Sequence, residues 1–253
     1  MLFHQLTQAA RQAAHVHGLR LCEFTLGALL THVRVTDGTR TASGVCLTPT
    51  REGQPTPIRT DSLEAIWEEG GKFDVYRRAL ALAAANAVGQ WQRASIPSTD
   101  PTGMRDLLLR HLVEDSTPDT AIVFIGHLRP VVAGLRAAGR RPLVFCRAEN
   151  DPEQGVYNDI FEYEGLAGAE VVVMTGAALI GSTADAVIRA SSGARRRYAV
   201  GFSAGANPEW FHGSGITHVA SPLLADLPRT VPASNDLDAL FAYPAYCDAV
   251  PSA

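Results

Sequence analysis

The 253-residue chain contains only four cysteines, and no two of them form a C-x-x-C pair. Three of the four lie in apolar, strand-like runs, where cysteine acts mostly as a small buried hydrophobe. The sequence therefore predicts no disulfide framework, and this use of cysteine is typical of a protein of the reducing cytoplasm.

Long apolar runs are also missing. A membrane span needs roughly 20 apolar residues, whereas the longest run here, around Ala79 to Val88, is rich in alanine and interrupted by Asn86. The first residues lack the basic start and apolar block of a secretory signal. They show instead the spacing of an amphipathic helix. We therefore expect a soluble globular protein that does not contact a membrane.

The sequence has no excess of basic charge. Its formal net charge is -4, and the basic residues are scattered except for the triplet 195–197. Nucleic-acid binding by phosphate neutralisation is therefore not expected. The triplet lies between an expected helix and an expected strand, which favours a solvated turn over an anion site.

Metal-binding motifs are absent from the sequence. There is no H-E-x-x-H and no Cys/His cluster. His15 and His17 are two residues apart, so a helix would point them in different directions. No metal site is predicted.

The first half of the chain has the pattern of a small α+β domain. After the first helix, an antiparallel meander turns at Asp37-Gly38 and returns over 42–47. A loop over 50–60 leads to a short helix capped by Asp61 or Ser62, and then to a long helix over 74–91. The stretch 94–103 is a predicted linker, followed by a bridging helix over 104–113.

The second half alternates strands with helices. The expected strands are AIVFIG, RPLVFC, EVVVMTG, YAVGFS and THVASPLL. Such apolar, β-branched runs between helices indicate a parallel, doubly wound sheet. An acidic stretch after the second strand is expected to be irregular, and the tail from Arg229 is weakly patterned. The prediction is an α/β fold with domains 1–100 and 101–253, whose ligand lies at the carboxyl ends of the strands.

The turn after the first of these strands is a candidate ligand loop. Gly126 lets backbone approach a ligand, and the helix that follows Leu128 favours negative charge at its start. No G-x-G-x-x-G or G-x-x-x-x-G-K-[ST] occurs, so nicotinamide and ATP binding have no motif support. Glu149, about 20 positions on, is placed either to hold a ribose or as a surface carboxylate. His127 is the candidate general base.

Hydroxyl side chains gather in the loop after the third strand. Gly176 allows an unusual backbone, while Ser182 and Thr183 can cap the next helix or contact a ligand. Ser182 as a plain N-cap is an equal alternative. This loop, which begins at Thr175, is expected to form a wall of the ligand site.

Gly201 to Gly205 spells G-x-S-x-G, the pattern of a nucleophile elbow. An elbow needs a long helix directly after the serine, and Asn207-Pro208 intervenes here. Only His212 and His218 follow, too close to leave a usable acid between. We therefore favour Ser203 as a ligand-contacting hydroxyl over a hydrolytic nucleophile.

Asn86 interrupts a helix that is otherwise apolar on all sides. A buried amide must find partners, because an unsatisfied one costs about 1–3 kcal/mol. Asn86 either bonds backbone in the core or faces a cleft between the domains, and its position leaves both open.

The segments VVVMTGAALIGSTADAVI and YAVGFSAGANPEWFHGSGITHVASPLLAD resemble the C-terminal domain of the heavy-metal chelation family, whose biochemical function is unknown. GVCLTP and AAANAVG resemble the enolase-N-terminal-like domain that precedes it. The resemblance covers about Cys22 to Asp226. The motifs are short, but their order and spacing agree with the family.

The resemblance implies an enolase-like cap packed on a Rossmann-like domain related to methyltransferases, with a site in the cleft between them. It places six residues of this chain in the cleft lining: Asn86, Gly126, Thr175, Gly176, Thr183 and Ser203. Gly181 stands where the family usually carries Asn, and Phe202 where it usually carries Pro. The loss of an amide at Gly181 removes a polar contact and puts a shared substrate in doubt.

The leading hypothesis is a small-molecule enzyme that binds an S-adenosylmethionine-like or other nucleotide-like ligand in the cleft. It would catalyse a group transfer, condensation or lyase step on a metallophore, pterin or amino-acid-derived compound. With His127 as the catalytic residue, the expected ligand contacts are Asn86, Gly126, Leu128, Glu149, Asn150, Thr175, Gly176, Ala177, Ser182, Thr183 and Ser203. The rival is a non-catalytic binding protein for a heavy metal or metal chelate. A homodimer is expected only because it is the commonest oligomer.

Overall fold

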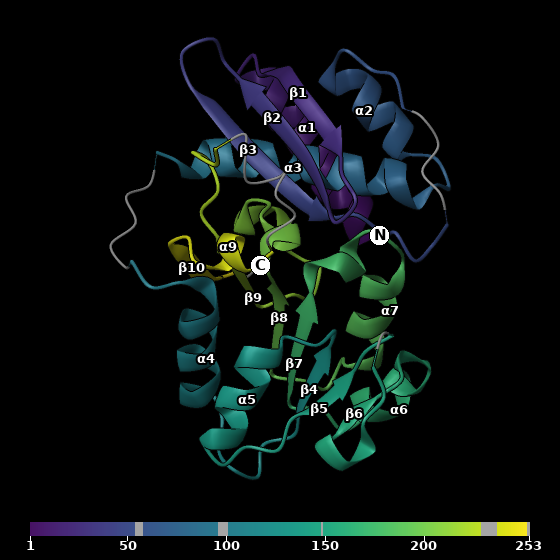
Figure 1. The fold of residues 1–253 in the computed structure, drawn as a ribbon, viewed down its shortest axis with the longest axis vertical. Coiled ribbons are helices and arrows are strands. Elements are labelled where there is room, and N and C mark those ends of the chain that lie inside the picture. Colours follow the sequence, from purple (N-terminus) through teal and green to yellow (C-terminus); the bar gives the residue numbers. More distant parts are fainter. Residues whose placement is uncertain (54–57, 96–100, 148, 229–236, 252–253) are drawn as a thin grey trace.

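The computed structural model describes residues 1–53, 58–95, 101–147, 149–228 and 237–251. An N-terminal α+β unit lies over the carboxyl ends of the parallel strands of a larger α/β unit (Figure 1). Residues 96–100, half of the predicted linker, lie outside the described residues.

The N-terminal unit is a three-stranded antiparallel meander with helices. Its elements are α1 (Leu2–Val16), β1 (Arg20–Leu26), β2 (Leu30–Thr36), β3 (Thr41–Leu47), α2 (Leu63–Gly70) and α3 (Val75–Arg93). Asp37 closes the turn between β2 and β3 by accepting hydrogen bonds from the amides of Thr39 and Arg40. These bonds lower the pKa of Asp37 to about 2. Ser62, and not Asp61, caps α2, because its side chain accepts from the Ala65 amide.

The alanine-rich run of the sequence forms the buried helix α3. Every residue from Ala79 to Trp91 is buried, and small side chains let the helix backbone approach β3 closely. A Cβ on Gly44 of β3 would lie 2.1 Å from the Ala87 amide nitrogen. The run is therefore a core helix, and within the described ranges no helix is long and apolar enough to cross a bilayer.

The C-terminal unit is built on a seven-stranded sheet in the order β10-β9-β8-β7-β4-β5-β6. Six strands are parallel and β10 pairs with β9 in the antiparallel sense. The strands are β4 (Ile122–Ile125), β5 (Leu143–Phe145), β6 (Val156–Tyr157), β7 (Val171–Thr175), β8 (Arg196–Val200), β9 (His218–Pro222) and β10 (Ala245–Ala249). The predicted α/β class with a mostly parallel sheet is confirmed.

Helices cover both faces of this sheet, as Figure 1 shows. The α-helices are α4 (Met104–Glu114), α5 (Arg129–Ala137), α6 (Glu162–Leu166), α7 (Thr183–Ala190) and α9 (Leu237–Phe241). Short 3₁₀ turns occupy η1 (Pro152–Gln154), η2 (Asp159–Phe161), η3 (Gly176–Leu179), η4 (Phe202–Ala204) and η5 (Pro208–Phe211).

Two strands of the sheet were not predicted from the sequence. β6 lies in the acidic stretch expected to be irregular, and β10 lies in the weakly patterned tail. A strand of two residues shows no periodicity. Both strands are edges of the sheet, so they lack the continuous apolar pattern of strands buried on both faces.

The arginine triplet is tied to the protein backbone. Arg197 donates to the carbonyls of Ser191, Ser192 and Gly215, and Arg195 donates to the Asp115 carbonyl. Arg196 and Arg197 already belong to β8, so the triplet begins a strand and is not a solvated turn.

Candidate functional site

The order of the strands defines where a ligand site is expected. β4 lies between β5, which follows it in the chain, and β7. The chain therefore continues from β4 and from β7 toward opposite sides of the sheet, and in such folds a ligand is expected at the carboxyl ends of these two strands. The predicted residues Gly126 to Leu128 and Thr175 to Ala177 directly follow β4 and end β7.

Gly126 and Thr175 meet at this point. Gly126 has a φ of 93°, which favours glycine because a side chain is strained there. A Cβ on Gly126 would also lie 2.5 Å from Thr175 Oγ1. The structure thus brings together two predicted site residues from separate strands, and it packs them directly against each other.

Beside them, His127 and Glu149 form a hydrogen-bonded pair. His127 Nδ1 lies 2.8 Å from Glu149 Oε2, and the same oxygen accepts from Arg129 Nε at 3.3 Å. Burial alone would raise the pKa of Glu149, but the bonds from His127 and Arg129 outweigh it and hold the pKa below its ordinary value. Glu149 is therefore ionised at neutral pH.

The ionised carboxylate determines how the imidazole is protonated. A carboxylate can only accept hydrogen bonds, so His127 Nδ1 must carry the proton of this bond. In the neutral ring, Nε2 then keeps its lone pair and can act as a base. The His127 side chain is 11% exposed and that of Glu149 29%, so the pair lies at the edge of solvent.

Glu149 thus has a role that the sequence did not suggest. It was predicted to hold a ribose or to be a surface carboxylate, and the structure shows that it orients His127. Both of its bonds end on Oε2, and among the described residues none donates to Oε1. His127 and Glu149 are 22 residues apart, and one strand-helix-strand unit, β4-α5-β5, connects them. This separation could have indicated the pair, because it places both residues at the carboxyl ends of neighbouring parallel strands.

Other predicted site residues lie in the loops at the carboxyl ends of the strands. Leu128, Ala177 and Thr183 are half-buried, whereas Asn150 and Ser182 are exposed. Ser182 occupies the N-cap position of α7, but its side chain makes no capping bond. Its hydroxyl therefore does not play the plain N-cap role that was the alternative.

Asn86 bonds backbone in the core. Its Nδ2 lies 2.8 Å from the Val45 carbonyl, 3.1 Å from that of Ser203 and 3.3 Å from that of Phe202. It thereby joins α3 and β3 of the N-terminal unit to η4 of the C-terminal unit. Asn86 is fully buried, and its Oδ1 has no hydrogen-bond partner within the described part of the chain.

Ser203 and Gly176 lie in the same buried contact. The Ser203 hydroxyl accepts from the Leu47 amide at 2.9 Å, and the residue is 4% exposed. A Cβ on Gly176 would lie 2.5 Å from the Ala204 amide nitrogen. We call the contact that Asn86, Gln90 and Ser203 form between the two units the seam.

The seam corrects the picture of an open cleft. Asn86 and Ser203 were predicted to line it, but they form hydrogen bonds across the contact between the units, and Gly176, predicted with them, packs against Ser203 within the C-terminal unit. The physical reason is that α3 is buried on all sides, so its amides must bond in the interior. Gln90, which the sequence analysis did not select, does the same with the carbonyls of Gly205 and Pro222.

Ser203 does not have the surroundings of a hydrolytic nucleophile. Ser203 lies inside the short 3₁₀ turn η4, and the next helical element is another short turn, η5, where an elbow would have a long helix. His212 Nδ1 bonds the Pro251 carbonyl and His218 Nδ1 bonds Thr217 Oγ1, both at 3.0 Å. Phe202, which departs from the family pattern, packs with Leu30 and Val45 in an apolar cluster.

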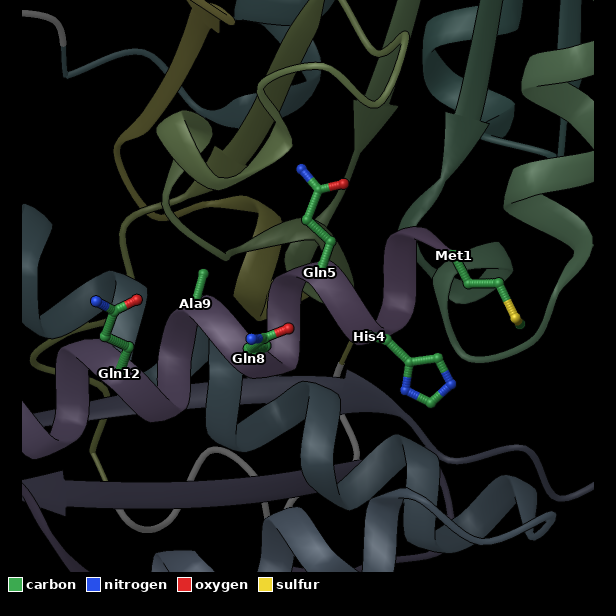
Figure 2. A pocket seen from close by; sticks show the side chains of 6 residues that line it. All are labelled: Met1, His4, Gln5, Gln8, Ala9 and Gln12. Atoms are coloured by element: carbon green, nitrogen blue, oxygen red, sulfur yellow. The ribbon is translucent and has the colours of Figure 1, made fainter.

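Two surface hollows, and the arrangement of possible metal ligands, add no residue to the predicted site. In the described ranges, no three His, Cys, Asp or Glu residues are grouped to hold a metal ion. A shallow hollow of about 440 Å³ runs along α1 between Met1 and Gln12 (Figure 2). A second, of about 300 Å³, lies between Leu143 and Phe161. Neither is lined by a predicted site residue.

Strand order and site together define a doubly wound α/β protein with an N-terminal α+β cap. Family models described as "Putative heavy-metal chelation" match residues 110–233 and 8–89, and the chain belongs to this family. An uncharacterized protein of Methanocaldococcus jannaschii is 28% identical over 218 residues, which is 84% of this chain and 82% of that protein.

Two crystal structures of family members of unknown function share the fold. The one from Pyrococcus horikoshii has a TM-score of 0.81 at 22% identity and covers 99% of this chain and 100% of its own. The one from Desulfitobacterium hafniense has a TM-score of 0.63 at 14% identity, with 83% and 87% covered. At these identities the likeness establishes the fold alone.

Proposed function

We propose that this protein is a small-molecule enzyme that binds an S-adenosylmethionine-like or other nucleoside-containing ligand beside β4, with His127 as its general base. The observation that carries the proposal is the His127–Glu149 pair at the carboxyl edge of the sheet. A carboxylate that fixes the tautomer of an imidazole is a recurrent arrangement for proton transfer.

The residues around the pair fit a nucleoside. Glu149 Oε1 is available to accept from ribose hydroxyls, as an acidic residue does in related α/β folds. α5 and α7 begin at this end of the sheet without a side-chain cap. The amides of their first turns, other than at Pro130, which has no N–H, can therefore donate to an anionic or polar group. Leu128 and Ala177 supply apolar surface, and Thr183 a hydroxyl.

In the proposed reaction the protein would move one proton. Nε2 of His127 would take it from the substrate nucleophile, and ionised Glu149 would stabilise the imidazolium that forms. Bound S-adenosylmethionine would supply an activated alkyl group. We favour group transfer over condensation or a lyase step. The family description favours metal-chelating products, such as a metallophore, a pterin or an amino-acid derivative.

The first test identifies the ligand. Native mass spectrometry of the purified protein shows any retained molecule, and thermal shifts with S-adenosylmethionine and S-adenosylhomocysteine follow. We expect adenosyl ligands to stabilise the wild type, and Glu149→Ala to weaken binding about tenfold or more because it removes the proposed acceptor for the ribose hydroxyls. Glu153→Ala removes an exposed acid of η1, which lies just before β6, and as the control it should bind normally.

Two outcomes would contradict the proposal. If no adenosyl compound stabilises the protein, the ligand assignment fails. If the protein instead binds a heavy-metal ion or chelate tightly and leaves it chemically unchanged, the non-catalytic alternative is correct.

A further inference from the structure

Arg129 is a charged residue of the candidate site that the proposed proton transfer does not use. It is the first residue of α5 and stands two residues after His127. Its Nε lies 3.3 Å and its Nη2 3.2 Å from Glu149 Oε2, the oxygen that also bonds His127 Nδ1 at 2.8 Å. A single carboxylate oxygen therefore keeps the guanidinium close to the imidazole.

The Arg129–Glu149 pair is held loosely. Both nitrogens approach the same oxygen, whereas an arginine that locks a carboxylate bonds its two oxygens in parallel. Charge-assisted bonds of this kind are usually about 2.7–2.9 Å long, so both distances here exceed that range. The Arg129 side chain is also 72% exposed, and exposed ion pairs contribute little to stability. Stability therefore does not account for this arginine.

Arg129 keeps donors that the protein does not use. A guanidinium carries several N–H donors in a rigid planar fork. Glu149 accepts along the edge of Nε and Nη2, and within the described part of the chain no acceptor bonds Nη1. This leaves the edge of Nη1 and Nη2, which can bond two oxygens of a carboxylate or a phosphate at once.

The positive charge of Arg129 also acts on the proposed base. Ionised Glu149 stabilises the imidazolium that forms when His127 takes a proton, but Arg129 opposes it, because two like charges close together repel each other. Without a ligand, Arg129 therefore weakens the base. An anion bound to Arg129 would cancel this charge and remove the opposition.

We propose that Arg129 recognises a carboxylate or phosphate group of the molecule on which His127 acts, and so selects anionic substrates. This inference rests on the proposed function, since it assigns a substrate class to the same site. It makes the base strongest when an anionic substrate is in place, because the bound anion offsets the charge of Arg129. The anion site can be measured without knowledge of the whole substrate.

NMR of the intact protein, with the arginine Nε–Hε resonances assigned, tests the site with two probes, acetate and inorganic phosphate. At an ionic strength held constant with sodium chloride, we expect at least one probe to shift the Arg129 resonance saturably, with a Kd of about 1–10 mM. The probe that binds more tightly identifies the group as carboxylate or phosphate. Arg136, at the other end of α5, donates to the Gln154 carbonyl and is the internal reference, whose resonance should not move.

Three variants sharpen this test, with binding followed by the backbone amide resonances near His127. Arg129→Gln should weaken binding of the tighter probe about tenfold or more, because it removes the charge and the fork. Arg129→Lys keeps the charge but not the paired bonds, so it should weaken binding only about two- to fivefold. Arg136→Gln, on the same helix, is the matched control and should bind like the wild type.

Three results would overturn the inference: no saturable shift at Arg129 with either probe, equal shifts at Arg129 and Arg136, or unchanged binding in Arg129→Gln. The proposed function fails separately. If an anion binds at Arg129 but no adenosyl compound stabilises the protein, the anion site stands and the adenosyl ligand is wrong. If adenosyl compounds bind and the anions do not, the inference about Arg129 alone is wrong.

Discussion

The contact between the two units is held in two ways, by buried neutral amides in the seam and by ion pairs nearer to solvent. The seam uses neutral amides and close backbone contacts that exclude water, with Asn86 and Gln90 bonding carbonyls of the other unit. Elsewhere in the contact, ion pairs join Glu52 to Arg147 and Arg93 to Asp248. The side chains that bond carbonyls in the seam are thus neutral and buried, whereas the charged side chains that join the units lie nearer to solvent.

The largest loss of stability is expected where the backbones of the two units approach each other most closely. A Cβ on Gly89 of α3 would lie 2.5 Å from the Asn207 amide nitrogen and 2.9 Å from two backbone atoms of Ala206. Gly89→Ala should therefore destabilise the protein by about 3 kcal/mol, although alanine favours a helix. Thermal or denaturant unfolding measures this. Gly168→Ala, where a Cβ meets nothing within 4 Å, is the control, and an equal loss there would contradict the close-contact explanation.

A smaller effect is expected from the buried amide. Asn86→Ala leaves the carbonyls of Val45, Phe202 and Ser203 without this donor, which should cost about 2 kcal/mol of unfolding free energy. The comparison variant is Gln92→Ala on the same helix, which loses a half-buried bond to Asn207. It should cost less than about 1 kcal/mol. Similar losses in both variants would show that burial does not distinguish these amides.

The smallest effect concerns the bonds of Glu149 to His127 and Arg129 and the pH dependence of the stability that they contribute. Because the folded pKa of Glu149 is lowered, its bonds to His127 and Arg129 contribute stability that is fully present above its ordinary pKa of 4.5 and is lost as the pH falls through the folded value. Carboxyl NMR titration should find a midpoint below 4.5. Arg129→Ala should move it upward. A midpoint at or above 4.5 would show that burial, and not the hydrogen bonds, dominates.

Local patterns predicted most of the scaffold. The Ser62 cap, the Asp37-Gly38 turn and the parallel strands follow from residue spacing, because each depends on neighbours in the chain. β6 and β10 were missed because short edge strands are defined by their pairing partners. The enolase-like nature of the first unit and the division after residue 100 remain predictions.

The candidate site was predicted only in part. Gly126 and Thr175 do meet, since parallel strands bring their carboxyl ends to one edge. The pairing of His127 with Glu149 was not predicted, because it depends on how two loops lie side by side. For Asn86 the sequence left two roles open, and its environment in the fold places it in the seam.

By itself, the sequence determined that this is a two-part α/β protein with a parallel sheet, because periodicity and turn residues act locally and repeat along the chain. Only the tertiary structure decided which polar residues hold the units together and which face solvent. Ser203 and Glu149 both follow strands. Ser203 is buried and accepts a hydrogen bond from the Leu47 amide, whereas Glu149 bonds His127 near the surface. Burial and partner choice arise from contacts between distant segments, which spacing along the chain does not encode.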